Sequence, residues 1–431
     1  MTPDVRIYTL DNGCKVLVRP TPGKEILSIV ADVAWGARDD HPDRTGLTGL
    51  MTRLLVKGAD GRSAFEVAER LESVGASLEP YCSHDSCGLD AQCASEDWRL
   101  AFEVLTDCLF APNLAESEFE HERALAIAEL RRADDDKFSL TYRKFLELFY
   151  RGHFYATMPE GDVETVEQLT LAEVRALHAR VVRPDSVLLT VVGNLPEDEL
   201  LAEIQKRWPA RPVEAMPERR LAVRKPGAGM GETLLLTKEA EQAFVIQGYL
   251  AARLGSPDSA PLRLVSAILG EGMSARLFAR LRDRDHLAYA VGTSLAGREA
   301  CSHLILYIGT SPATAQAARE GLLRETAGLL TEPLSEEEFE RARRYVLGKY
   351  LIARQTNNAL AHSMLAGERL GLGWEWGEHL PDRMKVVTRS QVLDVAQRYL
   401  TQPATAILHP AAGAFGDTLI ETDDSDYDQS E

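Results

Sequence analysis

The sequence lacks the patterns of a cysteine-based scaffold and of a membrane span. Its six cysteines form no C-x-x-C pair within 431 residues, which argues against a zinc ribbon and a small disulfide-bonded fold. No run approaches the roughly 18–20 apolar residues that cross a membrane. The chain also does not begin with a basic segment followed by an apolar run. We therefore expect a cytoplasmic protein with no membrane partner.

Positive charge is scarce, above all near the C-terminal end. The formal net charge is −18, from 48 Lys and Arg against 66 Asp and Glu, and the last fifteen residues contain seven acids but no Lys or Arg. This composition predicts an acidic, disordered tail over residues 417–431. Because sequence-independent nucleic-acid binding depends on Lys and Arg neutralising phosphates, we expect no nucleic-acid partner.

An internal repeat indicates two related halves. Asn113–Arg123 matches Pro333–Arg343 at an offset of 220, and Thr170–Val174 matches Thr388–Val392 at 218. A stretch rich in proline and glycine separates the halves, as is typical of a connection. The predicted organisation is a first domain at 1–212, a linker at 213–232, a second domain at 233–416 and the tail.

Each half contains alternating segments near its start, then helical patterns, and then a closing apolar segment. The expected strands include Lys15–Arg19, Ile26–Ala34 and Val187–Val192 in the first half, and Thr233–Leu236, Phe244–Tyr249 and Ala404–Leu408 in the second. Such a pattern predicts the α+β class, with two homologous domains that each pack helices on a largely antiparallel sheet. Cys82, His84 and Cys87 are close in sequence, but the alternation from Tyr81 to Cys93 favours a pair of strands over a metal site.

Residues 46–58 form a strongly amphipathic helical pattern. The apolar side is Leu47, Leu50, Met51, Leu54 and Leu55, and the opposite side carries Gly49, Thr52 and Arg53. Further segments fall in a characteristic order: Leu10-x-Asn-Gly13, Gly36-Ala-Arg-Asp39, Gly46-Leu47, Lys57-Gly58, His153-x-Tyr155, Arg183-Pro-Asp185 and Gly193-Asn194. In these motifs the chain, from about Arg6 to Pro410, resembles the pitrilysin-like peptidases. It is most similar to their short bacterial members and to the mitochondrial processing peptidase subunits, which have two related domains.

The resemblance also identifies what this chain has lost. Active members carry the inverzincin signature H-x-x-E-H on the helix, where two His bind zinc, the Glu is the general base, and a later Glu completes the site. Here Gly49 and Arg53 stand at the His positions and Thr52 at the base, while Glu129 occupies the position of the later Glu. We therefore expect a degenerate zinc site and no metal cofactor in this chain.

The vacated position leaves Glu129 and its helix neighbour Glu122 without a cation. One interpretation is that both are ordinary solvated charges. The alternative follows from the resemblance: the guanidinium of Arg53 fills the place of the metal and pairs with Glu129 or Glu122.

The second half retains another part of the family's site. The segment Leu269–Phe278, followed by Leu281–Ala290, is similar to the family's carboxy-domain segment, whose Arg and Tyr match Arg282 and Tyr289. In active relatives this pair binds the substrate carbonyl and stabilises the oxyanion. Without the resemblance, Arg282 would be a solvated charge beside Asp283 and Asp285, and Tyr289 a strand aromatic facing the core.

These features together predict a catalytically silent subunit of a heterodimeric zinc metallopeptidase. The expected partner is a zinc-bearing paralogous subunit, to whose site Arg282 and Tyr289 would be supplied in trans, and the expected substrate is an unfolded peptide. Two alternatives remain: a structural or assembly subunit, and a homodimeric peptide-binding protein without proteolytic activity.

Overall fold

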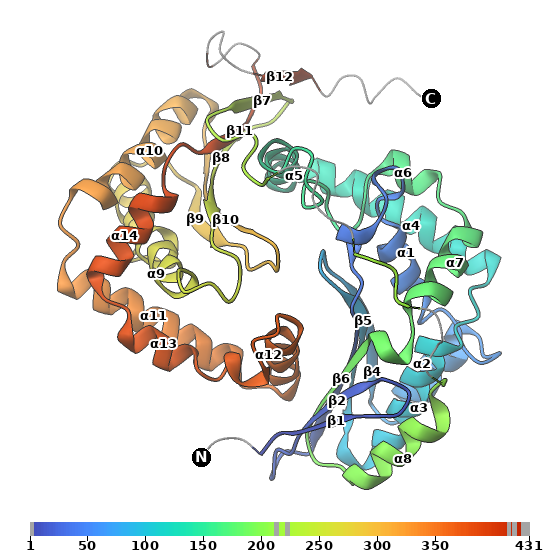
Figure 1. Cartoon of the computed structure of the whole chain (residues 1–431). Helices are drawn as coiled ribbons and strands as arrows, with labels where there is room; N and C mark the ends of the chain where they lie inside the picture. Colours follow the sequence, from blue (N-terminus) through green and yellow to red (C-terminus); the bar gives the residue numbers. More distant parts are fainter. Residues whose placement is uncertain (1–3, 211–214, 220–224, 412–414, 416–419, 424–431) are drawn as a thin grey trace. The chain divides into compact units, whose positions relative to one another are not determined.

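The computed structural model describes residues 4–210, 215–219, 225–411, 415 and 420–423, which form two compact units (Figure 1). The first unit consists of Met1–Arg131, Thr157–Leu221 and Ala353–Gly377. The second consists of Arg132–Ala156, Ala222–Ile352 and Glu378–Glu431. Each unit contains its own six-stranded sheet.

The sheet of the first unit has the order β1-β2-β6-β3-β5-β4. Its strands are β1 Arg6–Thr9, β2 Lys15–Arg19, β3 Ile26–Val33, β4 Ser77–Cys82, β5 Cys87–Ala94 and β6 Val187–Val192. Neighbouring strands pair antiparallel except β2 and β6, which are parallel. The expected strands at 15–19, 26–34 and 187–192 and the strand pair at 81–93 are therefore present.

The sheet of the second unit repeats this plan, with the order β12-β7-β11-β8-β10-β9. Its strands are β7 Thr233–Thr237, β8 Ala243–Ala251, β9 Ala290–Leu295, β10 Ser302–Thr310, β11 Ala404–His409 and β12 Ile420–Asp423. β7 and β11 are parallel, as are β2 and β6, and the β11–β8–β10–β9 ladder is antiparallel. The α+β class with two related, helix-packed sheets is confirmed.

Helices cover the sheet of the first unit through one continuous apolar core. They are α1 Leu47–Leu54, α2 Ala64–Glu72, α3 Trp98–Phe110, α6 Val163–Glu167, α7 Leu171–Val181 and α8 Glu197–Arg207. α1 contacts β4, β5 and α7, and α3 contacts β5. Alternate residues of β5, such as Leu89 and Ala91, are fully buried in this core, as the two-residue period of a strand requires.

The second unit has an equivalent set of helices. They are α9 Ser259–Gly270, α10 Ala315–Thr331, α11 Glu336–Ala353, α13 Leu380–Val386 and α14 Arg389–Tyr399. α10 and α14 contact β8, and α9 contacts β9 and α14, so these helices cover one face of the sheet (Figure 1). The repeated segments begin matching helices, α4 Glu116–Asp135 with α11 and α7 with α14.

Two helices each cover a sheet whose strands come from the other half of the sequence. α5 Lys137–Phe149 contacts β7, β8 and β11, and α12 Asn357–Arg369 contacts β3 and β6. On α12, Ala361 and Met364 are completely buried against Val30 and Val192 of the first sheet. The contiguous division expected from the sequence, 1–212 and 233–416, therefore does not describe this exchange, because the apolar pattern of a helix does not specify which sheet it covers.

The acidic tail was expected to be disordered throughout. Ile420–Asp423 instead forms β12, which adds to the edge of the second sheet in parallel with β7. Strand pairing satisfies backbone groups whatever the side chains are, so charge alone did not reveal it. The tail positions 417–419 and 424–431 lie outside the described residues. Among the described residues, no helix is both long enough and apolar enough to cross a membrane.

Candidate functional site

Helix α1 is held at its first turn by a buried carboxylate. The carboxylate of Asp40 accepts a hydrogen bond from the backbone N–H of Thr48 at 3.1 Å and another from its hydroxyl. Gly46, which precedes the helix, has a φ of 88° that favours glycine. Burial raises the pKa of Asp40 to about 7. Sequence reasoning missed Asp40, and an acid eight residues before Thr48 is too distant to match a helix-capping pattern.

Gly49 and Thr52, which the resemblance places at a zinc ligand and at the general base, are closely packed. A Cβ atom added at Gly49 would lie 3.1 Å from the carbonyl oxygen of Pro159, so a larger residue there requires a shift of that backbone. Thr52 is buried, and its hydroxyl donates to the carbonyl oxygen of Thr48 at 2.7 Å. Neither residue offers a metal ligand or a carboxylate base at this position.

Arg53 joins α1 to both acids of α4. Its Nε donates to Oε2 of Glu122 at 3.1 Å, and its Nη1 and Nη2 donate to the two carboxylate oxygens of Glu129 at 2.8 and 3.1 Å. Glu122 and Glu129 are seven residues apart, about two turns, and so lie on the same side of their helix. The hydrogen bonds to Glu129 raise the pKa of Arg53, which stays charged. The predicted pairing of Arg53 with these carboxylates is confirmed.

A second cation completes this cluster. Nζ of Lys57 lies 2.8 Å from Oε1 of Glu122, whose side chain is only 3% exposed. We call Arg53, Lys57, Glu122 and Glu129 the ion-pair cluster, and its two positive and two negative charges balance. The role of Lys57 was not predicted, because this residue lies beyond the end of α1 at Leu54, where helical spacing does not indicate its neighbours.

The donor atoms of this cluster do not fit zinc. Zinc in proteins takes His, Cys and carboxylate ligands, whereas Arg53 presents only N–H donors. Across the part of the chain that the structure describes, no group of three or more His, Cys, Asp or Glu side chains could hold a metal ion.

Tyr289 and Arg282 lie in the second unit, where Arg282 belongs to the π-helical segment Phe278–Arg284 and Tyr289 lies next to the edge strand β9. Tyr289 donates its backbone N–H to the carbonyl oxygen of Gly309 at 2.9 Å, directly before the edge strand β9, and is 62% exposed. Arg282 is also exposed, and its guanidinium lies 4.7 Å from the centroid of the Phe278 ring. The alternative in which Tyr289 faces the core is wrong. The exposure of Arg282 agrees with the alternative of a solvated charge, and the neighbouring Asp285 pairs with Arg284 and Arg324 at 2.8 and 2.7 Å.

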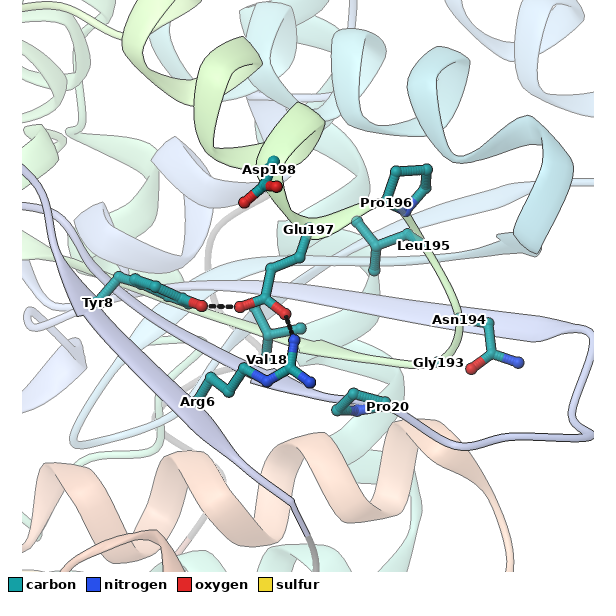
Figure 2. A pocket seen from close by; sticks show the side chains of 10 residues that line it. All are labelled: Arg6, Tyr8, Val18, Pro20, Gly193, Asn194, Leu195, Pro196, Glu197 and Asp198. Carbon is teal, nitrogen blue, oxygen red and sulfur yellow. Dashed lines mark hydrogen bonds and ion pairs between the residues drawn. The ribbon is translucent and has the colours of Figure 1, made fainter.

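A pocket of about 610 Å³ lies in the first unit, at the β1 edge of its sheet, where β1 meets the start of α8 (Figure 2). Glu197 lines this pocket, and its carboxylate accepts hydrogen bonds from the Tyr8 hydroxyl and the Arg6 guanidinium. Arg6 also pairs with Asp4 at 3.0 Å. Arg6 and Glu197 are therefore paired with each other in this pocket, and none of the predicted site residues lines it.

Comparison with known proteins is consistent with this geometry. The family model described as Insulinase (Peptidase family M16) matches residues 15–156, and the one described as Peptidase M16 inactive domain matches residues 168–346. An uncharacterized zinc protease of Mycobacterium leprae is 25% identical over 94% of this chain and 91% of its own length.

Solved structures show the same fold over nearly the whole chain. A protease from Helicobacter pylori has a TM-score of 0.88 at 20% identity, covering 95% of this chain and all of that one. A peptidase M16 inactive domain from Pseudomonas fluorescens has a TM-score of 0.87 at 18% identity, covering 96% of this chain and all of that one. The family expected from the sequence motifs is confirmed: the chain belongs to the M16 peptidase family.

Proposed function

We propose that this chain is the non-catalytic subunit of a heterodimeric zinc peptidase, and that it supplies Arg282 and Tyr289 to a zinc-bearing partner. The observation that carries this proposal is the ion-pair cluster, in which Arg53 binds the two acids of α4 at the position where active relatives would hold zinc. The domain described as inactive matches residues 168–346, which exclude Gly49, Thr52 and Arg53, so the proposal rests on the ion-pair cluster and not on that description.

Because Arg53 stays protonated, no change within the physiological pH range restores a catalytic base at its position. The guanidinium group stays protonated at physiological pH and does not act as a base. It also provides a fixed positive charge beside the exposed Glu129 and beside the buried Glu122, which Lys57 contacts as well. The fold therefore keeps its packing at this position without the metal and without the catalytic base.

The two retained donors are placed where another molecule can reach them. The Tyr289 hydroxyl and the Arg282 guanidinium are both exposed. A phenol and a guanidinium can donate hydrogen bonds to a substrate carbonyl and bind it more strongly as negative charge develops there. Their exposure is a condition of the complementing role, although an assembly interface could also use an exposed tyrosine.

The proposed substrate is an unfolded peptide. The sheets end in the strands β4 and β9, whose unpaired backbone groups can accept an extended segment as an additional strand. The mycobacterial relative is called a zinc protease, which agrees with peptide cleavage by the complete complex. Zinc would be held by the partner alone.

The proposal is tested by co-expression with an M16 relative from the same genome that carries H-x-x-E-H. The expected complex contains one zinc ion per pair of chains and cleaves an unfolded peptide, whereas this chain alone binds no zinc and cleaves nothing. Stable assembly without any contribution to cleavage would indicate the structural alternative. Peptide binding by this chain as a homodimer, with no partner captured, would indicate the peptide-binding alternative.

A further inference from the structure

Cys82 and Cys87 face each other across the hairpin of β4 and β5. The strand register pairs the two residues directly. Next to them, Ser83 donates its backbone N–H to the carbonyl oxygen of Ser86 at 2.7 Å. Because hydrogen-bonded and non-hydrogen-bonded pairs alternate along an antiparallel ladder, the two cysteines occupy a non-hydrogen-bonded pair. The Cα atoms of such pairs are about 4.5 Å apart, within the range of about 4.4–6.8 Å that a disulfide spans.

Both side chains lie on the same face of the sheet. Cys87 is 1% exposed within the core of the first unit, and Cys82 is half-buried and packs against the same core. The thiol of Cys87 is hydrogen-bonded to the hydroxyl of Thr52, the residue at the position of the lost general base. The pair therefore lies next to the degenerate zinc site, although it contributes nothing to the function proposed above.

We propose that Cys82 and Cys87 are a redox modification site. Their two thiols form a reversible disulfide with each other by exchange with a small-molecule disulfide such as glutathione disulfide. Cys82, the more exposed thiol, attacks one sulfur of the oxidant, forms a mixed disulfide and releases one glutathione. Cys87 then attacks the Cys82 sulfur and releases the second glutathione. The two protein thiols lose two electrons and two protons, and the oxidant becomes two glutathione thiols.

The neighbouring cysteine of β5 provides an internal control. Cys93 points to the same side of its strand as Cys87, but it stands opposite Leu27 on β3. Six residues along a strand correspond to about 20 Å, which is too far for a disulfide with either residue of the pair. Oxidation should therefore join Cys82 to Cys87 and leave Cys93 as a free thiol.

Burial makes this reaction slow at neutral pH. It raises the pKa of Cys87 to about 12 and the pKa of Cys82 well above its ordinary value. Because the thiolate is the attacking species, the rate should increase with pH. Once formed, the disulfide links the edge strand β4 covalently to β5, and Cys87 no longer has a thiol that can interact with Thr52.

The test uses the full-length chain, incubated with glutathione disulfide at pH 8, then quenched in acid and alkylated. A protease that cleaves before aspartate separates the three cysteines, because Asp85 and Asp90 follow Cys82 and Cys87 respectively. The expected product is a peptide linked through Cys82 and Cys87, with Cys93 alkylated, and dithiothreitol should return both cysteines to the alkylated form. A link to Cys93, or no link at all after prolonged oxidation, would overturn the proposal.

Two variants test the order of the steps. In Cys87→Ser, Cys82 should accumulate as a stable mixed disulfide with glutathione, because no second thiol resolves it. In Cys93→Ser, the matched control, the link should form at the wild-type rate. If Cys87→Ser gains no glutathione while the wild type still forms the link, Cys82 is not the attacking thiol and the proposed sequence of steps is wrong. The outcome does not depend on a partner subunit, so it is separate from the test of the proposed function.

Discussion

Arg53 donates two hydrogen bonds to Glu129, from Nη1 at 2.8 Å and from Nη2 at 3.1 Å, and its Nε donates to Glu122 at 3.1 Å. The two acids differ in environment, because the side chain of Glu129 is 55% exposed while that of Glu122 is 3% exposed. The guanidinium therefore compensates one buried charge and one hydrated charge. Its removal should affect the two acids unequally.

Replacing Arg53→Met should lower the free energy of unfolding by about 2 kcal/mol, because Glu122 then keeps only Lys57 as a cation in a buried site. Replacing Glu129→Gln should cost less than about 1 kcal/mol, because exposed ion pairs contribute little. Urea unfolding of the two variants measures both values. Equal losses for the two variants would show that the buried acid does not depend on Arg53.

Restoring the signature should restore zinc binding. The triple variant Gly49→His, Thr52→Glu and Arg53→His places two imidazoles and a carboxylate on α1, with Glu129 available on α4. We expect up to one zinc ion per chain by metal analysis, and no zinc when Glu129→Gln is added. The contact at Gly49 requires the carbonyl of Pro159 to shift by a few tenths of an ångström in the triple variant, which Thr52→Glu and Arg53→His together do not require. A folded triple variant without zinc would mean that α1 no longer has the family's ligand geometry.

Asp40 should make stability depend on pH. Its folded-state pKa of about 7 exceeds the unfolded value of about 3.9, so between these values the folded state binds more protons. This group therefore lowers the free energy of unfolding as the pH rises from about 4 to 7, by roughly 2–4 kcal/mol, and adds no slope above that range.

The variant Asp40→Asn removes this contribution. Its free energy of unfolding, measured relative to that of the wild type, should rise over the same pH interval and then level off. Asp43→Asn, a nearby exposed acid, is the control and should track the wild type at every pH. A constant difference between Asp40→Asn and the wild type from pH 4 to 8 would contradict the assignment.

The placement of α12 on the first sheet can be tested through Arg369. It forms an ion pair with Asp32, which is completely buried and also accepts a hydrogen bond from Tyr81 at 2.6 Å. Arg369→Met should cost about 3–5 kcal/mol of stability, because the buried carboxylate loses its cation. In the double variant with Asp32→Asn, a large part of that loss should return. If the two losses simply add in denaturant unfolding, the residues are not coupled and α12 does not lie where the structure places it.

How far the sequence predicts the molecule depends on the range of the interactions. The stripe Leu50, Met51 and Leu54 identifies α1 because a helix period is local, and the pairing of Arg53 follows once the metal ligands are seen to be missing. The exchange of α5 and α12 could not be predicted, since both helices have an apolar side that would cover either sheet. The strand pair at 81–93 was expected from alternation, but the opposition of Cys82 and Cys87 depends on the register that the turn imposes.

The same reasoning explains the result at Tyr289. Alternation alone allowed this residue to face the core or the solvent, since a strand presents side chains to both faces. In the structure Tyr289 faces the solvent, and its backbone N–H donates a hydrogen bond to the carbonyl oxygen of Gly309. Its exposure is the feature on which the complementing role depends.

The most direct measurement of that role is peptide cleavage by the reconstituted pair of subunits, comparing the wild type with Tyr289→Phe. The loss of one hydrogen-bond donor to the oxyanion should lower kcat by about 10²–10³-fold, with zinc content and assembly unchanged. Tyr399→Phe, which removes a hydroxyl bonded to Asp258 on the same unit, is the matched control and should cleave at the wild-type rate. Cleavage by Tyr289→Phe at the wild-type rate would contradict the account.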